Sequence, residues 1–143
     1  MGYTDAPDGW WREFVTATPR TGKLAVVRKD GTPHVSPIWV DVDGSSLVFT
    51  THRDSIKGRA ILRDGRVSVC LDDERPPFSF VTVTGRAEVV ADPEQVRYWA
   101  GRLGARYMGA ERANEFAERN GVDGELVVYV RDARIVAKVD VAD

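Results

Sequence analysis

Hydroxyl and basic side chains are concentrated near the middle of the chain, in the segment Thr50–Arg59. Residues 53–66 include five basic residues and two acidic ones. The pattern predicts that a strand ends near Thr51 and that a helix begins at Asp54 or Ser55. A helix N-terminus has unpaired N–H groups and a positive dipole end, so it favours an anion such as phosphate. A solvated basic helix without a ligand is the alternative.

A second segment with possible chemistry is His34–Trp39. Pro37 cannot donate a hydrogen bond to a strand ladder, so it belongs at a sheet edge or a bulge. The backbone groups of Ile38 and Trp39 would then be free to bond the edge of a flat heterocycle. The alternative is an edge strand on which Trp39 packs into the core or into a dimer interface.

Other candidate residues are isolated from one another. His34 and His52 are separated by a whole hairpin, whereas a metal site needs several converging ligands, so we predict no metal. Cys70 lies in an apolar run and is interpreted as an inert buried thiol. No Gly-x-Ser-x-Gly elbow is present, and we assign no catalytic residue.

The composition excludes several classes of protein. The chain has 143 residues and a formal net charge of −2, which argues against a nucleic-acid-binding protein. Its one cysteine excludes an internal disulfide. We found no apolar run long enough for a membrane span, and we expect a cytoplasmic protein with a single domain over residues 1–143.

The elements that must position these residues are mostly strands. Asp-Gly pairs at 30–31 and 43–44 predict tight turns within a three-strand meander. Gly58 weakens the predicted helix at 54–63, because glycine costs about 1 kcal/mol against alanine. The expected helices cover residues 8–18, 54–63, 92–103 and 111–120, and the expected strands cover 24–28, 34–41, 47–51, 67–71, 78–90, 126–131 and 135–141.

This order of elements indicates an α+β fold, because hairpins dominate and no βαβ alternation is seen. We therefore expect a six- or seven-stranded antiparallel barrel with peripheral helices. Apolar residues run almost continuously over 126–131, which predicts burial on both faces of that strand. A Gly-x-Gly-x-x-Gly fingerprint after a strand is absent, which argues against a Rossmann nucleotide site.

A series of short motifs resembles the split β-barrel flavin and deazaflavin oxidoreductases, the superfamily that includes pyridoxine 5′-phosphate oxidase. The similarity is greatest to the small actinobacterial branch that uses coenzyme F420. Order and spacing agree over nearly the whole chain. The matching segments are Asp30–Trp39, Leu47–Thr51, Lys57–Ala60, Asp64–Val67, Pro76–Phe78 and Thr84–Glu88.

The resemblance implies a homodimer whose cofactor occupies a groove between the subunits. It assigns the phosphate side to Thr50, Thr51, Ser55, Lys57 and Arg59, and the ring system to Ser36, Pro37, Ile38 and Trp39. Phe78 would approach from the partner chain.

One departure from the family pattern bears on the choice of cofactor. The flavin-binding oxidases carry a basic residue at each end of the segment that here reads His34–Trp39, and this chain has neither. That argues against pyridoxine phosphate oxidation and tight FMN binding. The long anionic tail of coenzyme F420, with its phosphodiester and glutamates, suits the cations Lys57, Arg59 and Arg63 better.

We therefore expect an F420-dependent oxidoreductase. It would transfer a hydride from the reduced cofactor to an electron-poor double bond of a planar small-molecule substrate, with solvent or His34 as the proton donor. The alternatives are an FMN-binding oxidoreductase of the same superfamily, a non-catalytic protein that binds a cofactor or a tetrapyrrole, and a structural dimer domain.

Overall fold

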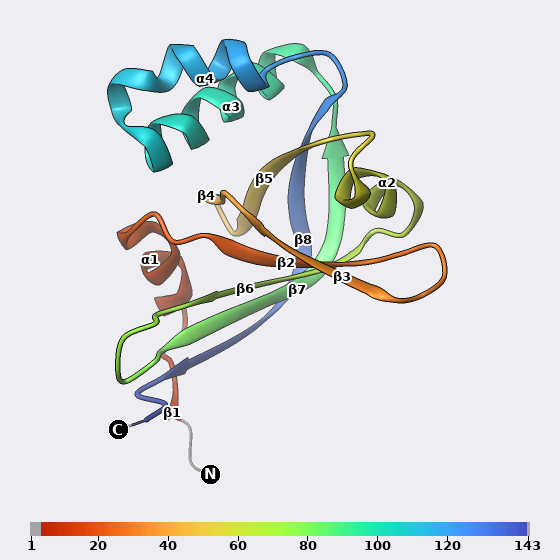
Figure 1. Ribbon diagram of the computed structural model, residues 1–143. Helices are drawn as coiled ribbons and strands as arrows, with labels where there is room; N and C mark the ends of the chain where they lie inside the picture. The colour runs from red at the N-terminus through yellow and green to blue at the C-terminus, as the bar shows by residue number, and fades with distance from the viewer. Residues whose placement is uncertain (1–3, 143) are drawn as a thin grey trace.

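One antiparallel sheet with helices around it makes up the computed structural model, which describes residues 4–142 (Figure 1). The elements in chain order are β1 (Thr4–Asp5), α1 (Trp10–Ala17), β2 (Gly22–Val27), β3 (Pro33–Ile38), β4 (Asp41–Asp43), β5 (Ser46–His52), α2 (Ile56–Arg63), β6 (Arg66–Asp72), β7 (Phe80–Val90), α3 (Pro93–Met108), a 3₁₀ turn (Ala110–Arg112), α4 (Ala113–Asn120) and β8 (Glu125–Val139).

The strands form one sheet in the order β3-β2-β6-β7-β8-β5-β4, and β1 adds to β8. All pairings are antiparallel, which confirms the expected α+β architecture. The hydrogen-bonded path is open, with β3 at one end and β4 at the other. The expected number of six or seven strands is wrong, since the sheet formed by residues 4–142 has eight. The two- and three-residue strands β1 and β4 are too short to produce a pattern in the sequence.

The expected three-strand meander is also wrong. β3 pairs with β2, but β5 pairs with β4 and β8 instead of continuing next to β3. The expected return strand at 34–41 stops at Ile38, and Trp39 and Val40 lie outside the strands. The chain leaves the sheet edge there, one residue beyond Pro37, which itself stays in register opposite Lys23.

A single long strand, β8, replaces the two strands expected near the C-terminus. The β7–β8 pairing has an irregularity between Thr84 and Arg86. A Cβ at Gly85 would lie 2.4 Å from the backbone oxygen of Arg131, so only glycine allows this close approach. β7 and β8 run side by side from the helical layer at the top toward the two termini below (Figure 1).

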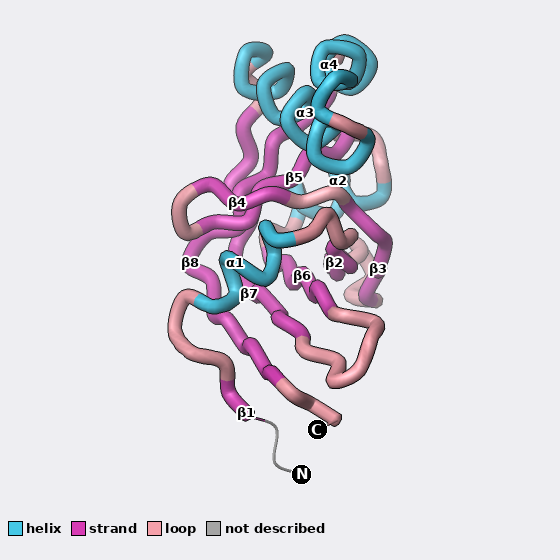
Figure 2. Tube along the Cα trace, turned by 90° about the vertical axis from the view of Figure 1, so that its left-hand side faces the viewer, coloured by secondary structure: helices cyan, strands magenta, loops and turns pink. Residues whose placement is uncertain are grey.

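α2 and α3 start at the caps that the sequence predicts, whereas α1 and α4 each start two residues after the predicted position. α3 begins with Pro93 after its cap Asp92, whose side chain accepts a hydrogen bond from the backbone N–H of Gln95 at 3.2 Å. α3 runs to Met108, five residues beyond the expected end. Figure 2 shows α3 and α4 together at the end of the molecule opposite the termini.

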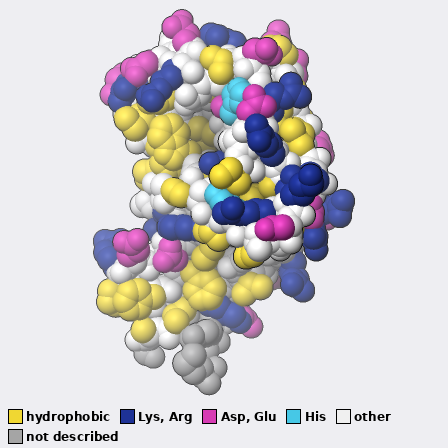
Figure 3. Space-filling view, turned by 45° about the vertical axis from the view of Figure 1, so that its right-hand side comes forward, with side chains coloured by type: hydrophobic (Ala, Val, Ile, Leu, Met, Phe, Trp, Pro, Cys, Tyr) yellow, Lys and Arg dark blue, Asp and Glu magenta, His cyan; other side chains and the backbone are white. Residues whose placement is uncertain are grey.

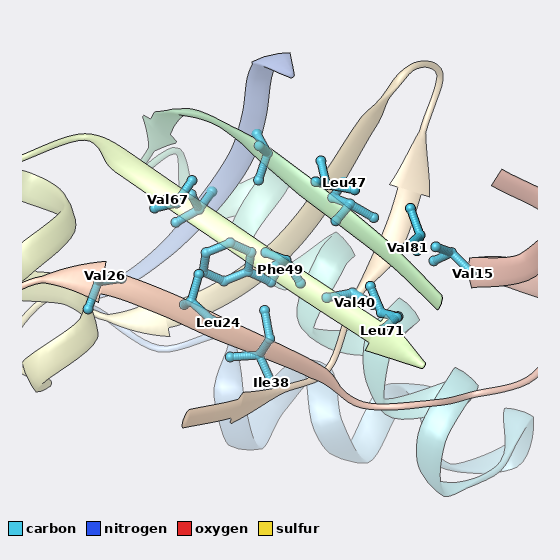
Figure 4. Close-up of a cluster of buried hydrophobic side chains, with 14 of the residues drawn as sticks. Val15, Leu24, Val26, Ile38, Val40, Leu47, Phe49, Val67, Leu71 and Val81 are labelled. Atoms are coloured by element: carbon cyan, nitrogen blue, oxygen red, sulfur yellow. The ribbon is translucent and has the colours of Figure 1, made fainter. Parts of the chain in front are cut away.

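Two apolar clusters hold the sheet together. The larger lies between the strands, α1 and α2, and Phe49 and Leu24 are fully buried in it (Figure 4). The smaller lies under α3 and includes Val48 and Trp99. Successive strand residues face opposite sides, so β5 sends Phe49 to one cluster and Val48 to the other. Residues 126–130 of β8 are buried too, which confirms the two-sided burial expected from the sequence.

Candidate functional site

A cleft of about 540 Å³ separates the α3–α4 pair from the ends of β3 and β5 and the start of α2. Figure 3 shows a hollow between the helical layer at the top and the body of the sheet, with Lys and Arg side chains beside it. The lining residues are Thr21, Pro37, Ile38, Trp39, Thr50, Thr51, His52, Ser55, Lys57, Ala100, Leu103, Asn120 and Glu125.

Hydroxyl groups organise the polar end of the cleft. Ser55 caps α2, because its Oγ accepts a hydrogen bond from the N–H of Gly58 at 2.9 Å. The same hydroxyl donates to the backbone oxygen of His52 at 2.7 Å. The Thr51 hydroxyl lies 3.0 Å from Ser55 Oγ, and it is the donor because the Ser55 proton is already used. Ser55 is therefore occupied as a cap, and it positions the helix.

The first turn of α2 offers backbone donors instead. Within residues 4–142, the N–H groups of Ile56 and Lys57 meet no acceptor, as expected for the start of a helix. The Lys57 side chain lines the cleft beside them. Two free N–H groups, the positive end of the helix dipole and an ammonium group make this corner suitable for an anion.

Gly58 explains how the helix can start so close to β5. A Cβ at this position would lie 2.1 Å from the backbone oxygen of His52 and 3.0 Å from Arg53 Cα. The glycine that weakens the helix prediction is thus required by the approach of α2 to the preceding turn. It fixes the direction in which the free N–H groups point.

Aromatic packing builds the apolar end. The Trp39 ring stacks on Tyr107 of α3, with centroids 5.2 Å apart and planes 5° apart, and meets the edge of Phe116 of α4 at 5.6 Å. Tyr107 is itself fixed, because its hydroxyl donates to the Arg20 oxygen at 2.7 Å and accepts from the Val40 N–H at 3.0 Å. Trp39 is consequently held rigidly against the helical layer at the border of the cleft.

An acidic and an imidazole side chain share the polar end. Glu125 lies opposite His52 in the β5–β8 ladder, and both line the cleft. Burial raises the pKa of Glu125, and the positive charges of His52 and Lys57 act in the opposite direction. The sequence does not predict that these two residues meet. His52 is an isolated histidine in the sequence, and only the β5–β8 pairing brings Glu125 opposite it.

Most of the predicted site residues meet in this cleft. Seven of them line it: Pro37, Ile38, Trp39, Thr50, Thr51, Ser55 and Lys57. Their roles in binding remain predictions.

Three predicted site residues lie elsewhere. Ser36 faces the core side of β3, because neighbouring strand residues alternate, and its Oγ is buried without a hydrogen-bond partner within residues 4–142. Arg59 is exposed, since it is two positions from Lys57 and so points to another side of the helix. Phe78 lies in the β6–β7 loop, at the opposite end of the sheet from α2 (Figure 1).

The described residues contain no cluster of three or more His, Cys, Asp or Glu side chains placed to hold a metal ion. Within 4–142, no helix combines the length and apolar character needed to cross a bilayer. His34, a possible proton donor in the sequence, lies outside the cleft, and its Nδ1 is buried without a partner in this part of the chain.

Comparison with known proteins places the chain in a family. The family model for pyridoxamine 5′-phosphate oxidase matches residues 10–139. The pyridoxine/pyridoxamine 5′-phosphate oxidase of Brucella anthropi is 33% identical over 93 residues, which cover 64% of this chain and 45% of that protein. The protein of the same name from Alkalilimnicola ehrlichii is 28% identical over 116 residues, covering 80% and 57%. The chain thus spans about half the length of these curated relatives.

Solved structures agree with this placement. A conserved hypothetical protein from Mycobacterium tuberculosis superposes with a TM-score of 0.81 and 25% identity, covering 100% of this chain and 92% of that one. A structure described as an F420 reductase gives a TM-score of 0.70 and 29% identity, covering 91% and 98%. The chain therefore belongs to the pyridoxamine 5′-phosphate oxidase family, within the split-barrel superfamily of flavin and deazaflavin oxidoreductases.

Proposed function

We propose that the protein is a coenzyme F420-dependent reductase acting on a planar organic substrate with an electron-poor double bond. The observation that carries the proposal is the cleft, which joins an anion-binding helix end to a wall built around Trp39. The similarity to an F420 reductase, at 29% identity over 91% of this chain, supports the same cofactor.

The residues present fit such a ligand. The free N–H groups of Ile56 and Lys57, with the Lys57 ammonium, match a phosphodiester at the polar end. Pro37, Trp39 and Leu103 offer apolar surface for a flat ring at the other end. The arrangement matches the general form of a cofactor site, which is mainly apolar with a few placed polar groups.

When bound, the reduced deazaflavin supplies a hydride from its C5 position, and the chain supplies orientation. Orienting two reactants is worth up to about 7–11 kcal/mol of a reaction barrier. Trp39 contributes by its fixed stack on Tyr107, and the helical layer of α3 and α4 keeps water from one side of the cleft. We assign the proton to solvent, because His34 lies outside the cleft.

An FMN-dependent oxidoreductase is the second candidate. The curated relatives carry the name pyridoxine/pyridoxamine 5′-phosphate oxidase, which favours FMN. The cleft favours the first candidate, because Lys57 is the one Lys or Arg among its lining residues in the described part of the chain. At the start of α2, a single lysine suits the one ionised oxygen of the F420 phosphodiester better than the doubly charged phosphate of FMN.

We also propose a homodimer. The exposed Phe78 is not a lining residue of the cleft, and its β6–β7 loop lies at the opposite end of the sheet from α2 (Figure 1), so the cofactor contact that the family resemblance gives it requires a second copy of the chain. Analytical ultracentrifugation, combined with cofactor titration at decreasing protein concentration, tests this. Binding should fall as the dimer dissociates, and a monomer that binds equally well would refute the shared groove.

A titration of coenzyme F420 and FMN into the same protein sample tests the proposed function. We expect a micromolar or tighter complex with F420 and weaker binding of FMN. Reduced F420 is then mixed with a panel of quinones and enones, and its oxidation is followed by absorbance. Tight binding of FMN alone would replace the first candidate by the second. F420 binding without turnover on any substrate would indicate a non-catalytic binding protein.

A further inference from the structure

The position of Glu125 in the cleft is tightly determined by the fold. Glu125 begins β8 directly opposite His52, and the N–H of Arg53 donates to the oxygen of the preceding Gly124 at 2.9 Å. A Cβ at Gly124 would lie 2.5 Å from His52 Nε2, so the imidazole rests against that glycine. The backbone at Glu125 is therefore held beside the turn that leads into α2, next to the proposed anion site.

Within residues 4–142, no hydrogen bond or salt bridge holds this carboxylate. Glu125 Oε1 has no contact with solvent, and within residues 4–142 it has no hydrogen-bond partner. A buried acceptor without a donor destabilises the folded state. Burial accordingly raises the pKa of Glu125. Because no donor within the described residues neutralises the carboxylate, its charge can act on a ligand in the cleft that Glu125 lines.

The charges in the cleft show what that action is. Lys57 and Glu125 have opposite charges and are both lining residues, so they act on a charged ligand in opposite directions. The positive end of α2, worth about half a unit charge, adds to the attraction that Lys57 exerts on an anion. A phosphate monoester carries about −1.5 to −2 at neutral pH, whereas a phosphodiester has one ionised oxygen. Because Glu125 offsets part of this attraction, the cleft suits one negative charge better than two.

We propose that Glu125 is a specificity-determining residue that admits a singly charged phosphodiester and disfavours a doubly charged phosphate monoester. The inference rests on the proposed function, since it concerns the cofactor that the same cleft takes. Repulsion from a fixed carboxylate grows in proportion to the charge of the ligand. The penalty is therefore about twice as large, in free energy, for the monoester.

The experiment compares two flavin ligands that share one ring and one sugar chain: FMN and its methyl ester, in which the phosphate is a phosphodiester. Dissociation constants are measured by titration calorimetry at pH 8 and low salt, for the wild-type protein and for Glu125→Gln. We expect Glu125→Gln to tighten FMN about 30-fold and the methyl ester about fivefold, since Coulomb energies scale with charge.

Two control variants separate charge from shape. Glu125→Asp keeps the charge, so its preference for the methyl ester over FMN should stay within about threefold of the wild-type value. Glu118→Gln removes one negative charge from an exposed position on α4 and should leave that preference unchanged. Thermal melts establish that each variant is folded.

Coenzyme F420 is titrated into the wild-type protein in the same series. If F420 binds and Glu125→Gln changes the affinities for FMN and its ester equally, the role of Glu125 is refuted while the proposed function stands. If neither F420 nor either flavin binds the wild-type protein, the role of Glu125 and the proposed function are both refuted. A changed ratio of the dissociation constants of FMN and its methyl ester in Glu118→Gln would also refute a local effect of Glu125.

Discussion

The C-terminus of α1 and the N-terminus of α2, two helices of eight residues each, differ in whether their backbone groups have hydrogen-bond partners. The first end contributes to stability, and the second is available for binding. At the C-terminus of α1, the Arg106 guanidinium donates to the backbone oxygens of Val15, of Thr16 at 3.2 Å and of Thr18 at 2.9 Å. At the N-terminus of α2, the donors of Ile56 and Lys57 have no acceptor within residues 4–142. The fold satisfies the first helix end from within and leaves the second for a ligand.

Removing Arg106 from the C-terminus of α1 has the largest expected effect on stability. Arg106→Met deletes the donors to three backbone oxygens, so we expect the free energy of unfolding to fall by about 3 kcal/mol. Chemical denaturation measures the loss, and Arg12→Met, at an exposed position on α1, serves as control. Cofactor affinity should hardly change, and a parallel loss of affinity would show that the two helix ends are coupled.

A methyl group at Gly58 should affect stability and binding together. Gly58→Ala forces a Cβ into contact with the backbone oxygen of His52, which we expect to cost about 1–3 kcal/mol and to turn the free N–H groups away. Gly65→Ala is the matched control, because its nearest neighbour would be 3.8 Å away. Denaturation and cofactor titration are both measured. Normal affinity in Gly58→Ala would contradict the role of this helix start.

Replacing Lys57 at the N-terminus of α2 should alter cofactor binding and leave stability unchanged. Lys57→Gln is expected to weaken coenzyme F420 about tenfold, equivalent to about 1.4 kcal/mol, without lowering the melting temperature. Arg59→Gln removes an equal charge from the exposed side of α2 and should change affinity less than about twofold. Equal losses in the two variants would mean that general charge, and not the cleft, attracts the ligand.

The smallest expected effect concerns pH. Because the pKa of Glu125 is raised in the folded state, the wild-type protein loses stability as the pH rises from the ordinary carboxyl range through that pKa. Glu125→Gln lacks this loss, so we expect it to melt a few degrees higher at pH 8 and equally at acidic pH, where both forms are uncharged. Melting curves over this range measure it, with Glu118→Gln as control. A difference in melting temperature between Glu125→Gln and the wild-type protein that is the same at all pH values would argue against titration of Glu125.

The same two helix ends show what the sequence can predict. The start of α2 is encoded locally: β5 ends at His52, Ser55 caps the helix and Lys57 lies in the first turn. Neighbouring residues determine that structure, so it could be predicted. The contacts at the C-terminus of α1 could not be predicted, because Arg106 is 88 residues from Thr18 and only the packing of α3 brings them together.

Non-local pairing explains the other differences. After Ile38 the chain turns to α3, where the Val40 N–H donates a hydrogen bond to the Tyr107 hydroxyl and so does not join the sheet. Glu125 reaches the cleft only through its pairing with His52. Such contacts carry no local signal in the residues around them, which is why the meander was wrongly expected and Glu125 was missed.

The most direct test follows the backbone amides of both helix ends by ¹H–¹⁵N NMR during titration with coenzyme F420. The account predicts that the amide resonances of Ile56 and Lys57 shift strongly, because their N–H groups gain an acceptor, while those at the end of α1, around Thr16 and Thr18, stay in place. Binding that leaves Ile56 and Lys57 unshifted would contradict the account.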